Sequence, residues 1–437
     1  MKRLFYTLLF FLPCMLIACG GSDDTPDGDN NPPVVAPPSE EPVDSRLLYN
    51  GIRLPEQWPP VRSSSSELEK GMSPFYLSDK PSVINISVGR QLFVDNFLIE
   101  STNLKRTFYY PEYYSGNPIL TPEQDWEKTG TKGAAFAAPF SDGVWYDEKE
   151  GKYKMWYMAG GGSYATSGAG VTCYAESTDG IHWTKPTLSV VAGTNIVDYN
   201  SERDASVIWL DKQESNASKR YKMFLVARES GKWRYHYKTS PDGKVWRAAV
   251  QSEAIADRST VYKNPFRNVW VYSMRHNVRV DANKLVRARD YNENTDPEAG
   301  TKKAEALLSA FWFGPWANEQ HHTDYPNIAP AIYNQDATPY ESIMLGFFSV
   351  WQGPENDVCA SDNVIKRNQV MVGYSRDGYS WFREDMNPFH AVNTTTSDAW
   401  NQGNLQSVAG APLIVGDKLY FYLSGRRLRG TQEITTD

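Results

Sequence analysis

The first residues whose types and spacing suggest chemistry are His321 and His322, which stand next to each other shortly before Asp324. Imidazole and carboxylate groups this close in sequence are common zinc ligands. Adjacent residues on an extended segment, however, point to opposite sides, and no third ligand follows at a recognisable spacing. We therefore expect no metal and no cofactor here, and interpret His321 and His322 as residues that contact a substrate.

The cysteines divide into two pairs with different prospects. Cys14 and Cys19 lie close to the N-terminus, and Leu16-Ile17-Ala18-Cys19 resembles a lipobox, in which the cysteine receives a lipid and becomes the new N-terminus. Only Cys173 and Cys359 remain for the folded region. One disulfide can form between them but is not required, because a domain of this length buries enough apolar surface without covalent links.

The N-terminus carries an export signal. Met1-Lys2-Arg3 is followed by an apolar run of about 14 residues, whereas a membrane-spanning helix needs roughly 20. We expect a signal peptide at 1–19 and, after it, a disordered tether at 20–66 rich in Pro, Gly, Asp and Ser. The predicted product is an exported protein, anchored to the outer membrane by the lipid on Cys19. An ordinary signal peptide that happens to contain this cysteine is the alternative.

The charge of the chain excludes one class of partner. The formal net charge is −7 and the isoelectric point is close to 5.6. A surface that binds nucleic acid carries an excess of positive charge. We therefore expect no nucleic-acid partner, and contact with a membrane only through the N-terminal lipid.

A repeated motif identifies the elements that position any active site. Ser-x-Asp-Gly-x-x-Trp occurs at 177–183, 240–246 and 375–381. The first two copies start 63 residues apart and the next two 135 apart, which indicates an intervening repeat without the motif. Periods of this size are typical of propeller blades. The Asp-Gly step predicts a tight turn in the outer hairpin of each blade, and the Trp is expected to pack between neighbouring blades.

Pairs of β-branched and aromatic runs precede each motif and predict the inner strands of the blades. The inner strands are expected to begin near 143, 206, 257, 330 and 406, which makes five blades, and the fifth supplies only two clear strands. We therefore predict an all-β protein, a five-bladed β-propeller over residues 85–437 with an incomplete last blade. The segments 91–95 and 105–110 are expected to pair with that blade and close the ring.

The pattern resembles the five-bladed propeller superfamily of glycoside hydrolases that contains families 32, 43, 62 and 68. More closely, residues 92–100, 153–157 and 401–407 are similar to exported bacterial proteins of a family 32-like group. The resemblance covers roughly residues 88–430. It implies an active site at the propeller axis, lined by the innermost strands, where carboxylates from different blades converge to cleave glycosidic bonds of poly- or oligosaccharides.

The resemblance implies catalytic carboxylates on the inner strands. Glu341 is our choice for general acid, and Asp204, in an Arg-Asp pair, is expected to stabilise the transition state. Asp257 opens the third blade. Asp142 and Asp95 compete for the role of base or nucleophile, because no Asn-Asp-Pro-Asn motif or equivalent is present. Each carboxylate has a structural alternative as a turn cap or as the partner of a neighbouring arginine.

Further residues are expected to contact the sugar. Most aromatic residues recur in the repeat and are expected to pack the blades, so the tryptophans outside it are the better candidates for a subsite. These are Trp312, Trp316, Trp351 and Trp400. The predicted substrate-binding residues are Arg203, Arg258, His321, His322, Asp336, Gln406 and Trp316.

Two other functions remain open. A non-catalytic glycan-binding propeller would keep the axial site with an incomplete acid and base pair, and the missing first-blade motif favours it. A polysaccharide lyase would need a Tyr or His base and a cation that neutralises a uronate. His321, His322, Arg258 and Arg426 are the residues that would serve a lyase.

Overall fold

The computed structural model describes residues 44–427, apart from 69, 129–134, 166–169, 200–201, 283, 307 and 397–398. The predicted signal peptide, the lipidation site Cys19 and the first part of the predicted tether lie outside the described residues. Within the described ranges, no helix has the length and hydropathy needed to cross a bilayer.

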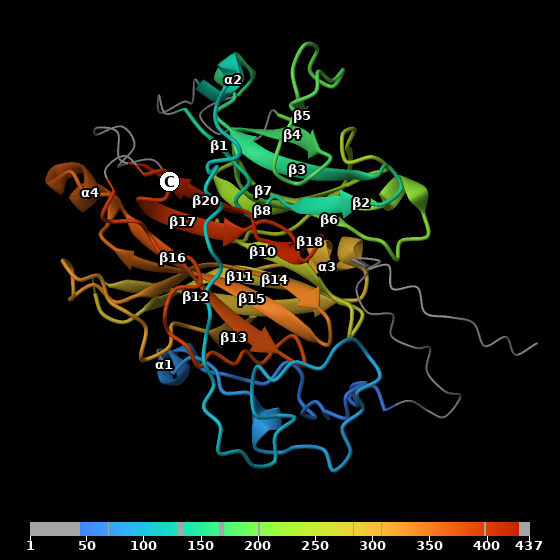
Figure 1. Cartoon of the computed structure of the whole chain (residues 1–437), viewed down its shortest axis with the longest axis vertical. Coiled ribbons are helices and arrows are strands. Elements are labelled where there is room, and N and C mark those ends of the chain that lie inside the picture. The colour runs from blue at the N-terminus through green and yellow to red at the C-terminus, as the bar shows by residue number, and fades with distance from the viewer. Residues whose placement is uncertain are drawn as a thin grey trace, which may run out of the picture.

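The described chain is built from antiparallel β-sheets that follow one another in chain order (Figure 1). The strands of the first blade are β1 (Ala137–Ala138), β2 (Val144–Asp147), β3 (Lys152–Ala159), β4 (Val171–Ser177) and β5 (Ile196–Asp198). Those of the second are β6 (Glu202–Leu210), β7 (Tyr221–Glu229), β8 (Lys232–Ser240) and β9 (Arg247–Gln251). Those of the third are β10 (Thr260–Asn264), β11 (Val269–Arg279), β12 (Leu285–Asn294) and β13 (Ala310–Phe313).

The last two blades are less regular than the first three. The fourth contains β14 (Ala331–Tyr340), β15 (Ile343–Gly353) and β16 (Arg367–Ser375), and bridges from β16 to Phe382 and His390 supply an irregular outer edge. The fifth consists of two short ladders, β17 (Gly403–Val408) with β20 (Leu423–Arg426) and β18 (Leu413–Val415) with β19 (Lys418–Tyr420). The predicted incomplete fifth blade is thus confirmed for the described residues.

The blades form a closed ring. The innermost strands contact their neighbours in the order β2, β6, β10, β14 and β17, and β20 returns to contact β1. Figure 1 shows this return, with the red strands of the fifth blade beside the first. The chain is therefore an all-β, five-bladed propeller, as predicted, and the inner strands surround its axis.

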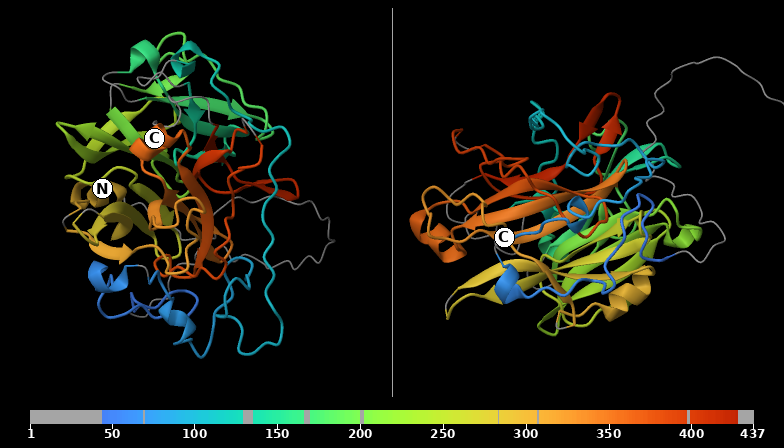
Figure 2. Two further views of the ribbon diagram at one scale, coloured as in Figure 1. Left: turned by 90° about the vertical axis from the view of Figure 1, so that its left-hand side faces the viewer. Right: turned by 90° about the horizontal axis from the view of Figure 1, so that it is seen from below.

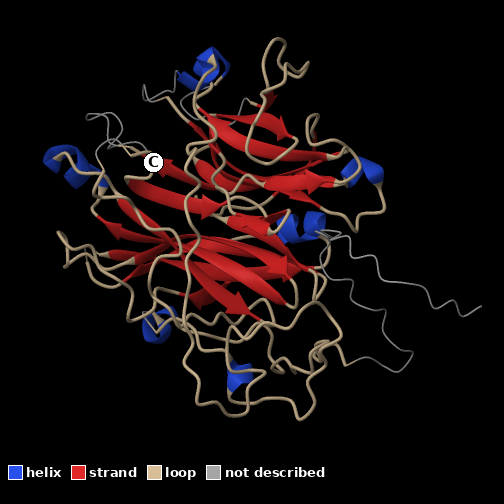
Figure 3. Cartoon of the chain, in the orientation of Figure 1, coloured by secondary structure: helices blue, strands red, loops and turns tan. Residues whose placement is uncertain are grey.

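The helices are short and lie at the periphery (Figure 3). They are α1 (Ser64–Glu67), η1 (Phe75–Leu77), α2 (Asp125–Lys128), η2 (Gly162–Tyr164), η3 (Ala217–Lys219), α3 (Pro297–Lys303) and α4 (Asn356–Asp362). Helix α3 lies between β12 and β13, where the third blade lacks the repeated motif, and it contacts β8 and β9 of the second blade. In the third blade, helix α3 therefore makes the contact with the preceding blade that the motif turn makes in the other blades.

The motif turns join each blade to the one before it. In each copy the Ser hydroxyl accepts the glycine N–H, and the Asp carboxylate accepts the two N–H groups that follow. The carbonyl group of each motif glycine accepts a hydrogen bond from an aromatic side chain of the preceding blade. Tyr422 donates to Gly180, Trp156 to Gly243 and Tyr262 to Gly378. All three glycines have φ between 73° and 77°, a region that favours glycine.

Two of the three motif tryptophans pack between blades, as expected, where Trp183 meets Tyr422 and Trp381 meets Trp312. The third, Trp246, is partly buried against the main core cluster. Further aromatic contacts connect successive blades, among them Trp209 with Trp270. Trp312 and Trp316 belong to this core, where Trp312 contacts Trp381 and Trp316 contacts Phe348 of the fourth blade. We therefore assign both residues to packing between blades and not to the substrate subsite expected from the sequence.

The N-terminal part of the described chain is folded onto the outside of the propeller (Figures 1 and 2). Residues from 44 onward form a small apolar cluster with Leu48, Ile52 and Tyr76 at its centre. The Tyr49 hydroxyl donates to the carbonyl of Ser342 in the fourth blade at 2.7 Å. Residues 44–66 thus have a packed position, in contrast with the disordered tether expected there.

The expected strands at 91–95 and 105–110 are absent, because side chains hold this segment in place of a ladder. The Asp95 carboxylate is buried and binds the Arg376 guanidinium at 2.7 Å. Arg106 pairs with Glu384. Asp95 therefore ties the N-terminal segment to the fourth blade and lies away from the axis, which excludes it as a catalytic base. Cys173 and Cys359 are buried free thiols and form no disulfide.

Candidate functional site

The candidate site is a ring of polar side chains that lie just before or within the inner strands. We call it the axial ring. Its members come from all five blades: Ser141, Asp142, Arg203, Asp204, Arg258, Asn334, Asp336 and Ser407. Because inner strands line the axis of a propeller, side chains at the same level can meet there, and polar and ring contacts connect each blade to the next.

An ion pair joins the first and second blades. The Arg203 guanidinium donates to the Asp142 carboxylate at 2.7 Å and to the Thr172 hydroxyl at 2.6 Å. Both partners are almost completely buried. Burial raises the pKa of the Asp142 carboxyl to about 6, although Arg203 acts in the opposite direction. Asp142 is therefore enclosed, and it cannot reach a substrate directly.

A second ion pair joins the second and third blades. The Asp204 carboxylate accepts the backbone N–H of Arg258 at 2.7 Å, and its other oxygen lies 3.2 Å from the Arg258 guanidinium. The Asp204 side chain keeps an exposed fraction of 13%. This carboxylate is thus oriented from two sides while one part of it remains accessible.

The third and fourth blades meet around Tyr333. The guanidinium carbons of Arg258 and Arg287 lie 5.5 and 4.5 Å from the centre of its ring, and the Lys366 ammonium lies 5.6 Å away. The Thr260 hydroxyl donates to the Gln335 carbonyl. Tyr333, Arg287 and Lys366 were not predicted from the sequence, because their positions around one ring depend on how the third and fourth blades meet.

Hydrogen bonds complete the ring through the fifth blade. The Asn334 amide donates to the hydroxyls of Ser141 and Ser407, both at 3.1 Å, and these hydroxyls are 3.1 Å apart. The Val408 N–H donates to the Asp336 carboxyl at 3.3 Å. Asn334 and Asp336 are two residues apart on one strand and share a face, which is the one local signal that could have grouped them.

Asp336 differs from the other carboxylates of the axial ring. Burial raises its pKa to about 7, although hydrogen bonds from Ser141 and the Val408 N–H lower it. The residue nevertheless remains partly exposed. A carboxyl group that keeps its proton near neutral pH is suited to act as a general acid.

The backbone around the axial ring adopts unusual conformations. Phe140, Arg258, Asn404 and Ser407 have φ angles of 40°, 55°, 51° and 61°. Each costs conformational energy for a residue with a side chain, and such strain is concentrated at functional sites. Phe140 and Arg258 precede β2 and β10, and Asn404 and Ser407 lie within β17.

Glu341 lies at the opposite end of its blade, so our choice of Glu341 as general acid requires correction. Strand β14 continues to Tyr340, and Glu341 occupies the turn to β15 with φ of 52°. Burial would raise its pKa, but hydrogen bonds from Arg90 outweigh this effect and lower the pKa. Strand β14 tolerates Pro339 because an inner strand is an edge strand.

The remaining predicted residues lie inside the blades or in the loop between β13 and β14. Asp257 pairs with Arg275 within the third blade. Gln406 is buried and donates to the Asn404 side chain at 2.7 Å. His321 approaches the carbonyl of Pro326 at 2.9 Å, and the ring of His322 contacts Tyr325. Among the described residues, no group of three His, Cys, Asp or Glu side chains could hold a metal ion.

A cavity of about 580 Å³ lies beside the axial ring, between the first and fifth blades. Its lining includes Phe140 and Asn404, and Trp400 contributes an aromatic wall. Of the four tryptophans expected to form a subsite, only Trp400 is among the described residues that line this cavity.

No protein-family model and no curated protein matches the chain. Among solved structures, a glycosidase candidate from Bacteroides thetaiotaomicron is similar at a TM-score of 0.46 and 13% identity, covering 72% of this chain and 92% of that one. A member of the GH130 family of mannoside phosphorylases, described as containing glycoside hydrolases for β-1,2-mannosidic linkages, has a TM-score of 0.42 at 12% identity, with coverages of 74% and 93%.

A fructofuranosidase from Schwanniomyces occidentalis, in complex with fructosylnystose, has a TM-score of 0.39 at 12% identity, with coverages of 66% and 54%. These values describe distant structural similarity to glycoside hydrolases, and they specify no activity for this chain.

Proposed function

We propose that this protein is a glycoside hydrolase that cleaves poly- or oligosaccharides at the axial ring. The observation that carries the proposal is the difference between two carboxyl groups of that ring. Asp336 has a pKa raised to about 7, and Asp204 is bound by Arg258 on two sides. Cleavage of a glycosidic bond needs one protonated and one ionised carboxyl group in different environments.

In this proposal Asp336 replaces Glu341 as the proton donor to the leaving oxygen. Asp204 is the ionised carboxylate, which accepts the proton of the water that attacks the anomeric carbon or attacks that carbon itself, and Arg258 orients Asp204. Arg203 and Asp142 act as positioning residues, because they are buried and connect the first two blades. Trp400 is proposed as an aromatic wall for the sugar chain beside the ring.

A polysaccharide lyase is the second candidate, favoured by the surroundings of Tyr333. The ring of Tyr333 lies between Arg258, Arg287 and Lys366 at 4.5 to 5.6 Å. A tyrosine base beside cations that neutralise a uronate is the arrangement that a lyase requires. The ion pairs of Asp142, Asp204 and Asp257 with arginines are also compatible with a propeller that only binds glycans.

Digestion of a panel of neutral and acidic glycans by the folded part of the chain separates these functions. New reducing ends without ultraviolet absorption support the hydrolase. Products that absorb through a new double bond contradict it and support the lyase. Binding without any product supports the non-catalytic propeller.

We also propose that the protein is exported and anchored to the outer membrane by a lipid on Cys19. The support is the charged start, the short apolar run and the lipobox-like Leu16-Ile17-Ala18-Cys19.

A further inference from the structure

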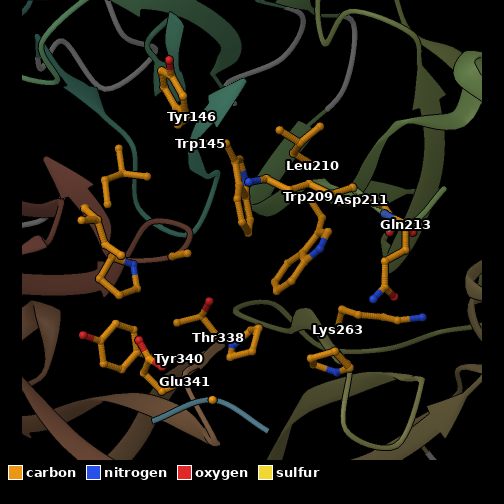
Figure 4. A pocket seen from close by; sticks show the side chains of 18 of the residues that line it. Trp145, Tyr146, Trp209, Leu210, Asp211, Gln213, Lys263, Thr338, Tyr340 and Glu341 are labelled. Carbon is orange, nitrogen blue, oxygen red and sulfur yellow. Dashed lines mark hydrogen bonds between the residues drawn. The ribbon is translucent and has the colours of Figure 1, made fainter. Parts of the chain in front are cut away.

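The opposite end of the propeller axis contains a second cavity, which the proposed reaction does not use. Its volume is about 250 Å³, and all five blades contribute to its lining, together with the N-terminal segment near Gly89. Figure 4 shows this cavity at the ends of the inner strands, with Glu341 at its rim. Pockets for drug-sized ligands have roughly 300–1,000 Å³, so the space suits a smaller molecule.

Two tryptophans form one wall of this cavity. The ring centres of Trp145 and Trp209 are 4.7 Å apart and their planes are inclined by 58°. The two residues are 8% and 7% exposed, and Figure 4 shows both rings reaching the open space. The Trp145 N–H is already donated to the Ile208 carbonyl at 2.7 Å. The wall therefore offers mainly apolar ring surface to an occupant.

Thr338 supplies a hydroxyl without a protein partner. The residue is 1% exposed, and its Oγ1 has no hydrogen-bond partner among the described residues. In Figure 4 the Thr338 side chain points from β14 toward the two tryptophan rings. A buried hydroxyl that makes no hydrogen bond costs free energy. This group therefore indicates an occupant that can bond with it.

Each charged side chain around the cavity already has a partner within the protein, an opposite charge in three cases and a neutral amide oxygen in the fourth. Glu341 pairs with Arg90 at 2.7 Å, and Asp211 pairs with Lys222 at 3.0 Å. Lys212 pairs with Glu148, and the Lys263 ammonium donates to the Asn268 amide oxygen at 2.8 Å. Because the two carboxylates are already paired with cations, an occupant needs no positive charge. The groups that remain to recognise it are two indole rings, the Thr338 hydroxyl and the exposed Gln213 amide.

We propose that this cavity is a second binding site, which takes one neutral pyranose sugar such as the terminal residue of an oligosaccharide. A pyranose has an apolar face of C–H groups that can lie on an indole ring and a rim of hydroxyls that can bond with Thr338 and Gln213. The site lies at the end of the axis opposite the axial ring, and its occupation does not depend on the proposed hydrolase activity.

The test uses the folded chain labelled with 5-fluorotryptophan and observed by fluorine NMR. The Trp145 and Trp209 signals are assigned with Trp145→Phe and Trp209→Phe. The probes are the methyl pyranosides of glucose, galactose, mannose and xylose, with sodium glucuronate for comparison, each up to about 100 mM to cover millimolar dissociation constants. We expect one neutral glycoside to shift both signals saturably.

Three variants locate the binding. Thr338→Val keeps the shape and removes the hydroxyl, and it should weaken binding about fivefold to tenfold. Thr338→Ser retains the hydroxyl and should restore most of the affinity. Asp336→Asn, in the axial ring, should leave the two signals and their midpoints unchanged. The proposal is overturned if no neutral glycoside moves either signal, or if Thr338→Val binds as well as the parent protein.

Discussion

Asp204 and Arg258 are joined twice, once through the backbone N–H of Arg258 at 2.7 Å and once through its guanidinium at 3.2 Å. Arg258 adopts a left-handed φ of 55° at this position. The double contact fixes the direction of the Asp204 carboxylate and connects the second blade to the third. The same arginine lies beside Tyr333. One residue thus orients a carboxylate and connects three blades.

Asp336→Asn should reduce turnover at least about 100-fold, because general acid catalysis typically contributes 10²- to 10⁴-fold. The measurement is the rate of release of reducing ends from the best glycan of the panel. Glu341→Gln is the matched control. Glu341 lies in the turn that follows β14, at the end of the strand opposite the axial ring, and pairs with Arg90. If Glu341→Gln loses activity and Asp336→Asn keeps it, the assignment of Asp336 is wrong.

The raised pKa of Asp336 should make stability fall as the pH rises. The folded state holds this proton up to about pH 7, whereas the ordinary pKa is 3.8, so the folded state binds more protons between these values. Raising the pH through this window should cost about 1–3 kcal/mol after allowance for solvent screening. Urea denaturation at pH 4.5 and 7.5 measures the difference.

Asp336→Asn should lose this part of the pH dependence and keep the part contributed by Asp142, whose pKa is raised to about 6. Activity should likewise decline above about pH 7, because the proton donor ionises. An identical pH dependence of stability in the variant and the parent would contradict the burial of an uncharged Asp336.

Gly243→Ala should destabilise the propeller more than Gly231→Ala, although both glycines have φ near 80°. A Cβ at Gly243 would lie 2.3 Å from the Trp156 ring, whereas one at Gly231 has no atom within 4 Å. We expect a loss of about 2–4 kcal/mol at Gly243 and about 1 kcal/mol at Gly231. Thermal unfolding checks this, and equal losses would show that the contact between blades contributes little.

Asp147→Asn should cost about 3–5 kcal/mol, the penalty for breaking a buried ion pair. Asp147 is fully buried and binds Arg220 and Lys154, at 3.0 and 2.9 Å. Burial would raise the pKa of Asp147, but the hydrogen bonds from Arg220, Tyr221 and Lys154 outweigh it and hold the pKa far below its ordinary value.

Glu148→Gln is the neighbouring control, because the Glu148 side chain is 48% exposed and pairs with Lys212 at the surface. Its effect should stay below about 1 kcal/mol. Chemical denaturation of both variants gives the comparison, and a small loss at Asp147 would mean that Arg220 and Lys154 find other partners.

Cys19→Ser should abolish lipidation in cells that export the full chain, measured by incorporation of labelled palmitate and by partition into detergent. Cys14→Ser should leave both unchanged, because Cys14 belongs to the predicted signal peptide. Incorporation that survives in Cys19→Ser would rule out the proposed anchor.

The sequence by itself determined the number and order of the blades. Its signals are local: an Asp-Gly turn needs four consecutive residues, and the aromatic runs before 177, 240 and 375 show the inner strands within each repeat. The absent motif of the third blade was also visible in the spacing, and α3 occupies that place. Turns and strands of this kind depend on backbone geometry and on the pattern of residue types over a few consecutive positions. A short segment therefore contains the information needed to predict them.

Only the tertiary structure decided which carboxyl groups meet at the axis. Asp336 lies within β14, and Glu341 follows the last residue of that strand, five residues later. Because the strand continues to Tyr340, the two carboxyl groups lie toward opposite ends of the propeller axis. The raised pKa of Asp336 depends on enclosure by the fourth and fifth blades. The environment of a side chain is set by the ring that the blades close together, and no short stretch of sequence contains that information.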